Sequence, residues 1–146
     1  MQQPGIKYAE SVKVLSVSSF ENDHAALQAI VGHSKWKLFK ADSYSAAVSI
    51  LRQGEISVVV CEHDLKSGTW TDFFDRMRDL AHPPSMIVTS RLADERLWAE
   101  ALNLGAWDVL AKPFVRTEVL RSVTAAWQHW YNHMPTNAMR VLSAAS

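Results

Sequence analysis

The sequence has little of several features that mark particular classes of protein. Its single cysteine cannot form a disulfide within the chain, and because Cys61 follows three valines we interpret it as a small core residue. Its 15 basic and 15 acidic residues give a net charge of zero at pH 7, so no overall field attracts nucleic acid or an anionic membrane. No segment approaches the roughly 18 apolar residues of a membrane span. None of its five glycines is close to another, which argues against a glycine-rich nucleotide-binding loop.

These absences favour a protein of a reducing compartment, and we expect the cytoplasm. The chain has 146 residues, of which 48% are hydrophobic, enough for the core of one ordinary domain. We place that domain at residues 12–134. Residues 1–11 are then an N-terminal extension, and residues 135–146 form a C-terminal tail or the start of a linker.

Short apolar or β-branched runs alternate five times with segments at helical spacing. The predicted strands cover residues 12–17, 36–41, 56–61, 85–89 and 107–111, and the predicted helices cover residues 20–31, 43–53, 73–80, 94–104 and 117–133. At the start of the first helix, Ser18 and Glu21 have the spacing of a capping box. Such alternation is typical of an α/β protein in which helices cover both faces of a doubly wound, five-stranded parallel sheet.

Polar side chains lie at or just beyond the carboxyl ends of four of the predicted strands. Ser18 and Ser19 come after the first strand, Glu62 comes after the third, Thr89 ends the fourth, and Lys112 follows the fifth. In an open parallel sheet, ligands bind beyond the carboxyl ends of the strands, near the point where strand order reverses. We therefore expect hydroxyl, carboxylate and ammonium groups to meet at that edge.

The most specific motif is the run GAWDVLAKPF at residues 105–114. It resembles the last strand and following loop of the response regulator receiver domains of two-component signalling, and the likeness extends over about residues 13–130. The resemblance implies the flavodoxin-like (βα)5 fold. It also implies that Lys112 contacts a phosphoryl group, that a cis peptide bond precedes Pro113, and that Thr89 takes the position of the hydroxyl that turns toward phosphate.

Two departures from the family pattern bear on function. Receiver domains hold Mg²⁺ with two acidic residues after the first strand, where this chain has Ser18 and Ser19. Their phosphoacceptor is an aspartate, and the matching position here is Glu62. We therefore predict an atypical, non-catalytic receiver that signals by protein–protein interaction, with Mg²⁺ binding weak or absent and no other cofactor.

Glu62 leaves two interpretations open, and two other functions compete with the atypical receiver. The Glu62 carboxylate either imitates a phosphoryl group by contacting Lys112, which fixes an active-like state, or forms a structural pair with Lys112 in a pocket that has lost its task. The first competing function is a working phosphoacceptor that uses Asp64 as a displaced acceptor. The second is a small flavodoxin-like cofactor-binding protein.

The expected interaction surface is the face formed by the fourth helix, the fifth strand and the last helix, which is the usual output and dimer face of receivers. Trp98, Trp107, Trp130 and Tyr131 are its candidate contact residues, whereas Trp127 fits the apolar stripe of the last helix. We expect the partner to be another protein, such as a histidine kinase, or a second copy of the chain. Nucleic acid and membranes are not expected partners of this domain.

Two histidines of the last helix have the spacing of a metal-binding pair. His129 and His133 are four residues apart and so lie on one helix face. No cysteine, aspartate or glutamate nearby completes a ligand set, so we expect a solvated helix face and no metal site.

Overall fold

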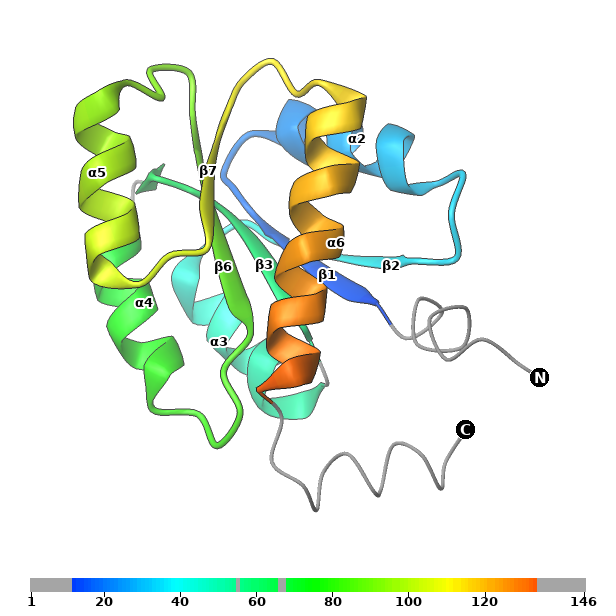
Figure 1. Ribbon diagram of the computed structural model, residues 1–146. Helices are drawn as coiled ribbons and strands as arrows, with labels where there is room; N and C mark the ends of the chain where they lie inside the picture. Colours follow the sequence, from blue (N-terminus) through cyan, green and yellow to red (C-terminus); the bar gives the residue numbers. More distant parts are fainter. Residues whose placement is uncertain (1–11, 55, 66–67, 134–146) are drawn as a thin grey trace.

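The structure is a computed structural model that describes residues 12–54, 56–65 and 68–133. Within these ranges, a five-stranded sheet stands between two groups of helices (Figure 1). The predicted N-terminal extension over residues 1–11 and the predicted tail over residues 135–146 lie outside the described residues. No helix in the described ranges is long and apolar enough to cross a membrane.

In the part of the chain that the structure describes, the sheet consists of five parallel strands in the order β2-β1-β3-β6-β7. Their bounds are β1 Lys13–Val17, β2 Lys37–Ala41, β3 Val58–Glu62, β6 Ser85–Ser90 and β7 Asp108–Ala111. The predicted doubly wound parallel sheet is confirmed. Strand order reverses between β1 and β3, so the loops that follow these two strands turn to opposite faces and leave a crevice at the carboxyl edge.

Five helices in the described residues cover the two faces of the sheet. Their bounds are α2 Glu21–Val31, α3 Tyr44–Gln53, α4 Trp70–Arg78, α5 Glu95–Leu104 and α6 Arg116–Asn132. Buried side chains of α2 and α6 pack in one apolar cluster, and those of α3, α4 and α5 pack in the other. The same division of helices between the faces is visible in Figure 1. The expected arrangement of helices on both faces is therefore present.

The strands supply both clusters because their side chains alternate between the faces. In β1, Leu15 belongs to the α3–α5 side and Val14 to the α2–α6 side. The central strands β3 and β6 are buried along their whole length. This burial explains the continuous apolar run of residues 58–61, since a strand covered on both faces has no solvent side that favours polar residues.

Two local features differ from the sequence prediction. The predicted capping box is wrong, because the N-cap of α2 is Phe20 and it makes no side-chain capping bond. Ser18 Oγ instead accepts a hydrogen bond from the Phe20 backbone N–H and donates one to Asp23 Oδ2. In addition, the loop after β3 contains a short antiparallel pair, β4 Asp64–Leu65 and β5 Gly68–Thr69, that the sequence did not predict.

Candidate functional site

Glu62 and Thr89 are neighbours at the carboxyl edge of the sheet. Glu62 ends β3 and pairs in register with Thr89 of β6. The Thr89 hydroxyl donates a hydrogen bond of 3.3 Å to Glu62 Oε2, and both side chains are buried. The structure thus brings together the carboxylate and one of the hydroxyls that the sequence placed at this edge.

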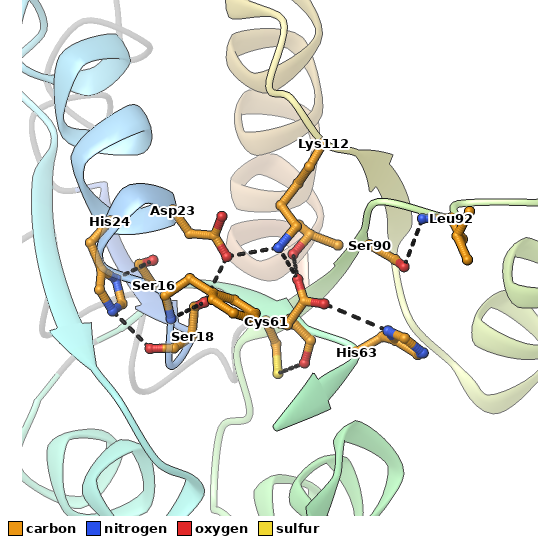
Figure 2. A network of polar contacts seen from close by, with 12 residues as sticks. Ser16, Ser18, Asp23, His24, Cys61, His63, Ser90, Leu92 and Lys112 are labelled. Carbon is orange, nitrogen blue, oxygen red and sulfur yellow. Dashed lines mark hydrogen bonds and ion pairs between the residues drawn. The ribbon is translucent and has the colours of Figure 1, made fainter. Parts of the chain in front are cut away.

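The ammonium group of Lys112 bridges two carboxylates in the same pocket. Its Nζ lies 2.5 Å from Glu62 Oε2 and 2.8 Å from Asp23 Oδ2. Figure 2 shows Lys112 reaching from the loop after β7 toward Asp23 on α2. The side chains of Lys112 and Glu62 are each 7% exposed and that of Asp23 is 14% exposed, so water screens these charges weakly. We refer to Asp23, Glu62 and Lys112 as the ion triad.

Asp23 is a site residue that the sequence reasoning missed. It lies in the first turn of α2, five residues beyond Ser18, and therefore outside the position directly after the first strand. The partial positive charge at a helix N-terminus favours an acidic side chain there. An acidic residue in the first turn of the first helix was the available signal, since that turn lies over the carboxyl end of β1.

A buried hydrogen-bond network holds the loop between β1 and α2 in place. Ser18 Oγ donates to Asp23 Oδ2 at 2.6 Å. The buried ring of His24 contacts Ser16 Oγ through Nδ1 at 2.8 Å and the backbone carbonyl of Ser18 through Nε2 at 2.9 Å (Figure 2). Because a carbonyl oxygen only accepts, Nε2 carries a proton. These contacts position the Asp23 carboxylate, whereas Ser19 is exposed.

Two aromatic rings and a cavity border the ion triad. Lys112 Nζ lies 5.1 Å from the centre of the Phe20 ring, within the range of a cation–π interaction. His63 Nδ1 lies 3.6 Å from Glu62 Oε1. A surface cavity of about 410 Å³ opens beside the ammonium group, and its lining residues are Asn22, Asp23, Ala26, Arg91, Lys112, Pro113 and Phe114. The triad is therefore approached between α2 and the loop that follows β7.

Cys61 lies beside the site in sequence but is part of the core. It has no exposed surface, and its Sγ donates a hydrogen bond to the backbone carbonyl of Glu62. Burial, and next the negative charge of Glu62, raise the pKa of the Cys61 thiol well above its usual value. The thiol therefore stays protonated at neutral pH and is not an activated nucleophile. The prediction of a core cysteine is confirmed.

Asp64 occupies a different environment from Glu62. Its side chain is exposed, and its backbone pairs with Thr69 in the short β4–β5 hairpin. Glu62, by contrast, is 6% exposed and is bonded to Lys112. Glu62, and not Asp64, is therefore the carboxylate of this segment that contacts Lys112.

The loop after β7 carries the features that link the chain to a family. The peptide bond between Lys112 and Pro113 is cis, which confirms the expectation from the sequence motif. A family model described as the response regulator receiver domain matches residues 14–124, which is more than half of the chain. The chain belongs to the response regulator receiver family. Among curated proteins, none matches this receiver domain in sequence.

Solved receiver domains share the fold at low sequence identity. The receiver domain of an HD domain-containing protein from Pseudomonas fluorescens Pf-5 is 23% identical, with a TM-score of 0.75 over 83% of this chain and 90% of that one. A receiver domain from Clostridium thermocellum is 15% identical, with a TM-score of 0.76 over 84% and 99% of the chains. The chemotaxis response regulator CheY4 of Vibrio cholerae is 15% identical, with a TM-score of 0.71 over 79% and 98%. At these identities the similarity shows the fold alone.

The aromatic residues near α5, β7 and α6 divide into exposed and buried groups. Trp98 is 50% exposed and Trp107 is 37% exposed, as candidate contact residues must be. Trp127 is 7% exposed, which confirms its place in the core stripe of α6. The prediction of an exposed Trp130 is wrong, because its side chain is 9% exposed and packs in the α2–α6 core. Tyr131 is half-buried and stacks on Trp127.

Proposed function

We propose that this receiver domain is a non-catalytic signalling module of a two-component or phosphorelay-type system that works without phosphorylation and without bound Mg²⁺. The observation that carries the proposal is the ion triad, in which the Lys112 ammonium contacts both Glu62 and Asp23. The acidic and basic side chains of the pocket, which in a receiver bind a metal ion and a phosphoryl group, here contact one another.

The donor set supports weak or absent Mg²⁺ binding. Mg²⁺ requires near-octahedral coordination by oxygen, usually with one or two carboxylates. Ser18 and Ser19 offer only neutral hydroxyls after β1, and the Ser18 hydroxyl is already bonded to Asp23. The two carboxylate oxygens that point into the pocket, Asp23 Oδ2 and Glu62 Oε2, both contact the Lys112 ammonium. A metal ion would have to displace this internal cation, so the residues present do not fit Mg²⁺.

The contacts of Glu62 also support a site that does not accept a phosphoryl group. Glu62 Oε2 is buried, and it receives both the Lys112 ammonium and the Thr89 hydroxyl. An oxygen with these two partners is poorly placed to attack a phosphodonor. The same two partners are those that the family resemblance assigns to phosphate, so Glu62 imitates part of the phosphorylated state. We infer that the domain has one fixed, active-like state.

The α5–β7–α6 face is the proposed contact surface for a protein partner or a second copy of the chain. Trp98 and Trp107 are exposed there, and Leu104 is 44% exposed. Exposed tryptophans are enriched among residues that carry protein–protein binding energy. A fixed state of the pocket would present this face constitutively, without a kinase-dependent change.

The proposal is tested by measuring the intact mass of the protein after incubation with a small phosphodonor and Mg²⁺. The expected result is that the wild-type protein keeps its mass. A Glu62→Asp variant, alone and with Ser18→Asp and Ser19→Asp, restores the family's acceptor and acidic pair, and we expect a phosphoryl adduct in the combined variant.

The matched control is Asp64→Asn, which removes the exposed carboxylate two positions after Glu62. Labelling of the wild-type protein would contradict the proposal. If Asp64→Asn then abolished that labelling, the domain would be a working receiver with a displaced acceptor.

A further inference from the structure

The strand β2 forms one edge of the sheet, and β7 forms the opposite edge (Figure 1). Among the strands that the structure describes, β2 therefore pairs with β1 alone. The Lys37 backbone N–H donates to the Val12 carbonyl, so residue 37 directs its backbone groups toward β1. Because this direction alternates along a strand, Leu38 and Lys40 direct their N–H and C=O groups outward. The outer edge of β2 thus offers backbone donors and acceptors to another strand.

The side chains of β2 are basic and lie largely outside the core. Lys37, Phe39 and Lys40 are exposed, and Phe39 is 36% exposed although it is a large apolar residue. Neither lysine forms an ion pair within the described ranges. Leu38 is half-buried against the α2–α6 core, so the alternation of side chains places Lys40 on that face and Lys37 and Phe39 on the α3 face. Each face of the edge therefore carries one lysine.

The neighbouring sequence makes this edge basic in a chain whose net charge is zero. Between Asp23 and Glu55 the sequence has four lysine or arginine residues and one acidic residue, Asp42. The four basic residues, all of them exposed, are Lys35, Lys37, Lys40 and Arg52. A local excess of positive charge attracts acidic partners even where the whole chain has no net field.

The same charges decide which strands β2 does not accept. Lysines on an edge strand hinder pairing with neutral or basic strands, and like charges opposite one another destabilise a strand pair. Two copies of β2 side by side would bring Lys37 and Lys40 of both chains to one shared edge. A strand with acidic side chains would instead turn each of these contacts into an attraction. The edge therefore disfavours a second copy of the chain and selects an acidic partner.

We propose that the outer edge of β2 binds an extended acidic segment of another protein by strand addition. In this mode main-chain hydrogen bonds supply affinity, and side chains at alternate positions supply specificity. Lys37 and Lys40 are three residues apart, with Phe39 between them. The segment that fits has two acidic residues three positions apart and an apolar residue opposite Phe39. Since β2 and β7 are opposite edges of the sheet, this partner leaves the α5–β7–α6 face uncovered.

The test is a titration of the isotope-labelled full chain with short peptides, followed by NMR of the backbone amides. The acidic probe is a threonine- and valine-rich peptide with two glutamates three positions apart, and the control peptide has lysine at both positions. We expect the acidic peptide to bind saturably, with a dissociation constant below about 1 mM. The amides of Leu38 and Lys40 should shift most, and the lysine peptide should not bind.

Charge reversal on β2 provides the matched variants. In the combined Lys37→Glu and Lys40→Glu variant, the acidic peptide should bind at least about tenfold more weakly, because two attractive contacts become repulsive. The lysine peptide should now bind, and this gain of binding requires a folded variant. The control is the combined Arg76→Glu and Arg96→Glu variant, which makes the same change in net charge at exposed positions on α4 and α5. It should bind the acidic peptide as the wild type does.

A third measurement separates strand addition from charge attraction alone. N-methylation of the peptide residues that bond to β2 should abolish binding, whereas N-methylation of the alternate residues should not. The proposal is overturned if the acidic peptide does not bind up to about 1 mM, if both methylated peptides bind equally, or if the largest shifts lie outside β2. It is equally overturned if single-stranded DNA or phosphatidylglycerol vesicles shift the amides of β2 and the acidic peptide does not.

Discussion

Replacing Lys112 by methionine tests whether the ion triad stabilises the fold. Methionine keeps most of the apolar stem and removes only the ammonium group. In the variant, the buried carboxylate of Glu62 and the partly buried carboxylate of Asp23 lose the cation that lies 2.5 Å and 2.8 Å from them. They also repel one another without an intervening positive charge.

The magnitude follows from the charges that remain. At an effective dielectric constant of about 20, each carboxylate–ammonium contact represents about 6 kcal/mol of Coulomb attraction, most of which offsets the cost of desolvating the ions. Removing one partner from a buried ion pair costs about 3–5 kcal/mol, because the other charge is left uncompensated. Two carboxylates are left here, so we expect Lys112→Met to lower the free energy of unfolding by about 4–5 kcal/mol.

The assay is urea unfolding followed by tryptophan fluorescence and circular dichroism. A combined Lys112→Met and Glu62→Gln variant neutralises one of the two stranded charges and should recover about 2 kcal/mol relative to Lys112→Met alone. Lys40→Met on the exposed edge strand β2 is the matched control and should change stability by less than about 0.5 kcal/mol. A loss below about 1 kcal/mol for Lys112→Met, or no recovery in the combined variant, would refute the reasoning.

Three further predictions concern other parts of the domain. His24→Leu should cost about 2–4 kcal/mol in urea unfolding, because it removes two buried hydrogen bonds and leaves their partners on β1 and its loop unpaired. Gly105→Ala should lower the free energy of unfolding by about 1–2 kcal/mol in the same assay, because this helix C-cap has a φ of 111° and an added Cβ would lie 3.2 Å from a phenylalanine ring. The control Gly54→Ala, at a helix C-cap with a φ of −123°, should be nearly neutral. Burial lowers the pKa of His82, so the unfolded chain binds more protons than the folded one near pH 6. The contribution of neutral His82 to the free energy of unfolding should be fully present above its unfolded pKa of 6.5 and should decrease as the pH falls through that value. His82→Gln should therefore flatten the pH dependence of the urea midpoint.

The order of strands and helices could be predicted because each element has a local pattern. Three of these patterns depend on residues close together in the chain: the apolar run of β3, the glycine after α5 and the motif that contains Lys112 and Pro113. Strand period, helix period and turn chemistry are set by neighbouring residues, so a sequence carries them directly. The placement of Glu62 and Lys112 at one edge followed from the same pattern, since parallel strands end at a common edge.

The tertiary structure alone decided which side chains meet. Asp23 contacts Lys112 across 89 positions in the chain because the first turn of α2 lies at the carboxyl end of β1. Nothing in the local pattern around Asp23 specifies that partner. Trp130 lies near the end of α6, where the sequence pattern predicted an exposed side chain. The packing of α6 on the sheet nevertheless buries it. His82 shares a cavity with His129 only because α4 and α6 end at the same edge of the sheet. The local sequence determined the helices and strands. Contacts between distant residues depend on how all the elements pack together, and this packing placed the Lys112 ammonium between Asp23 and Glu62.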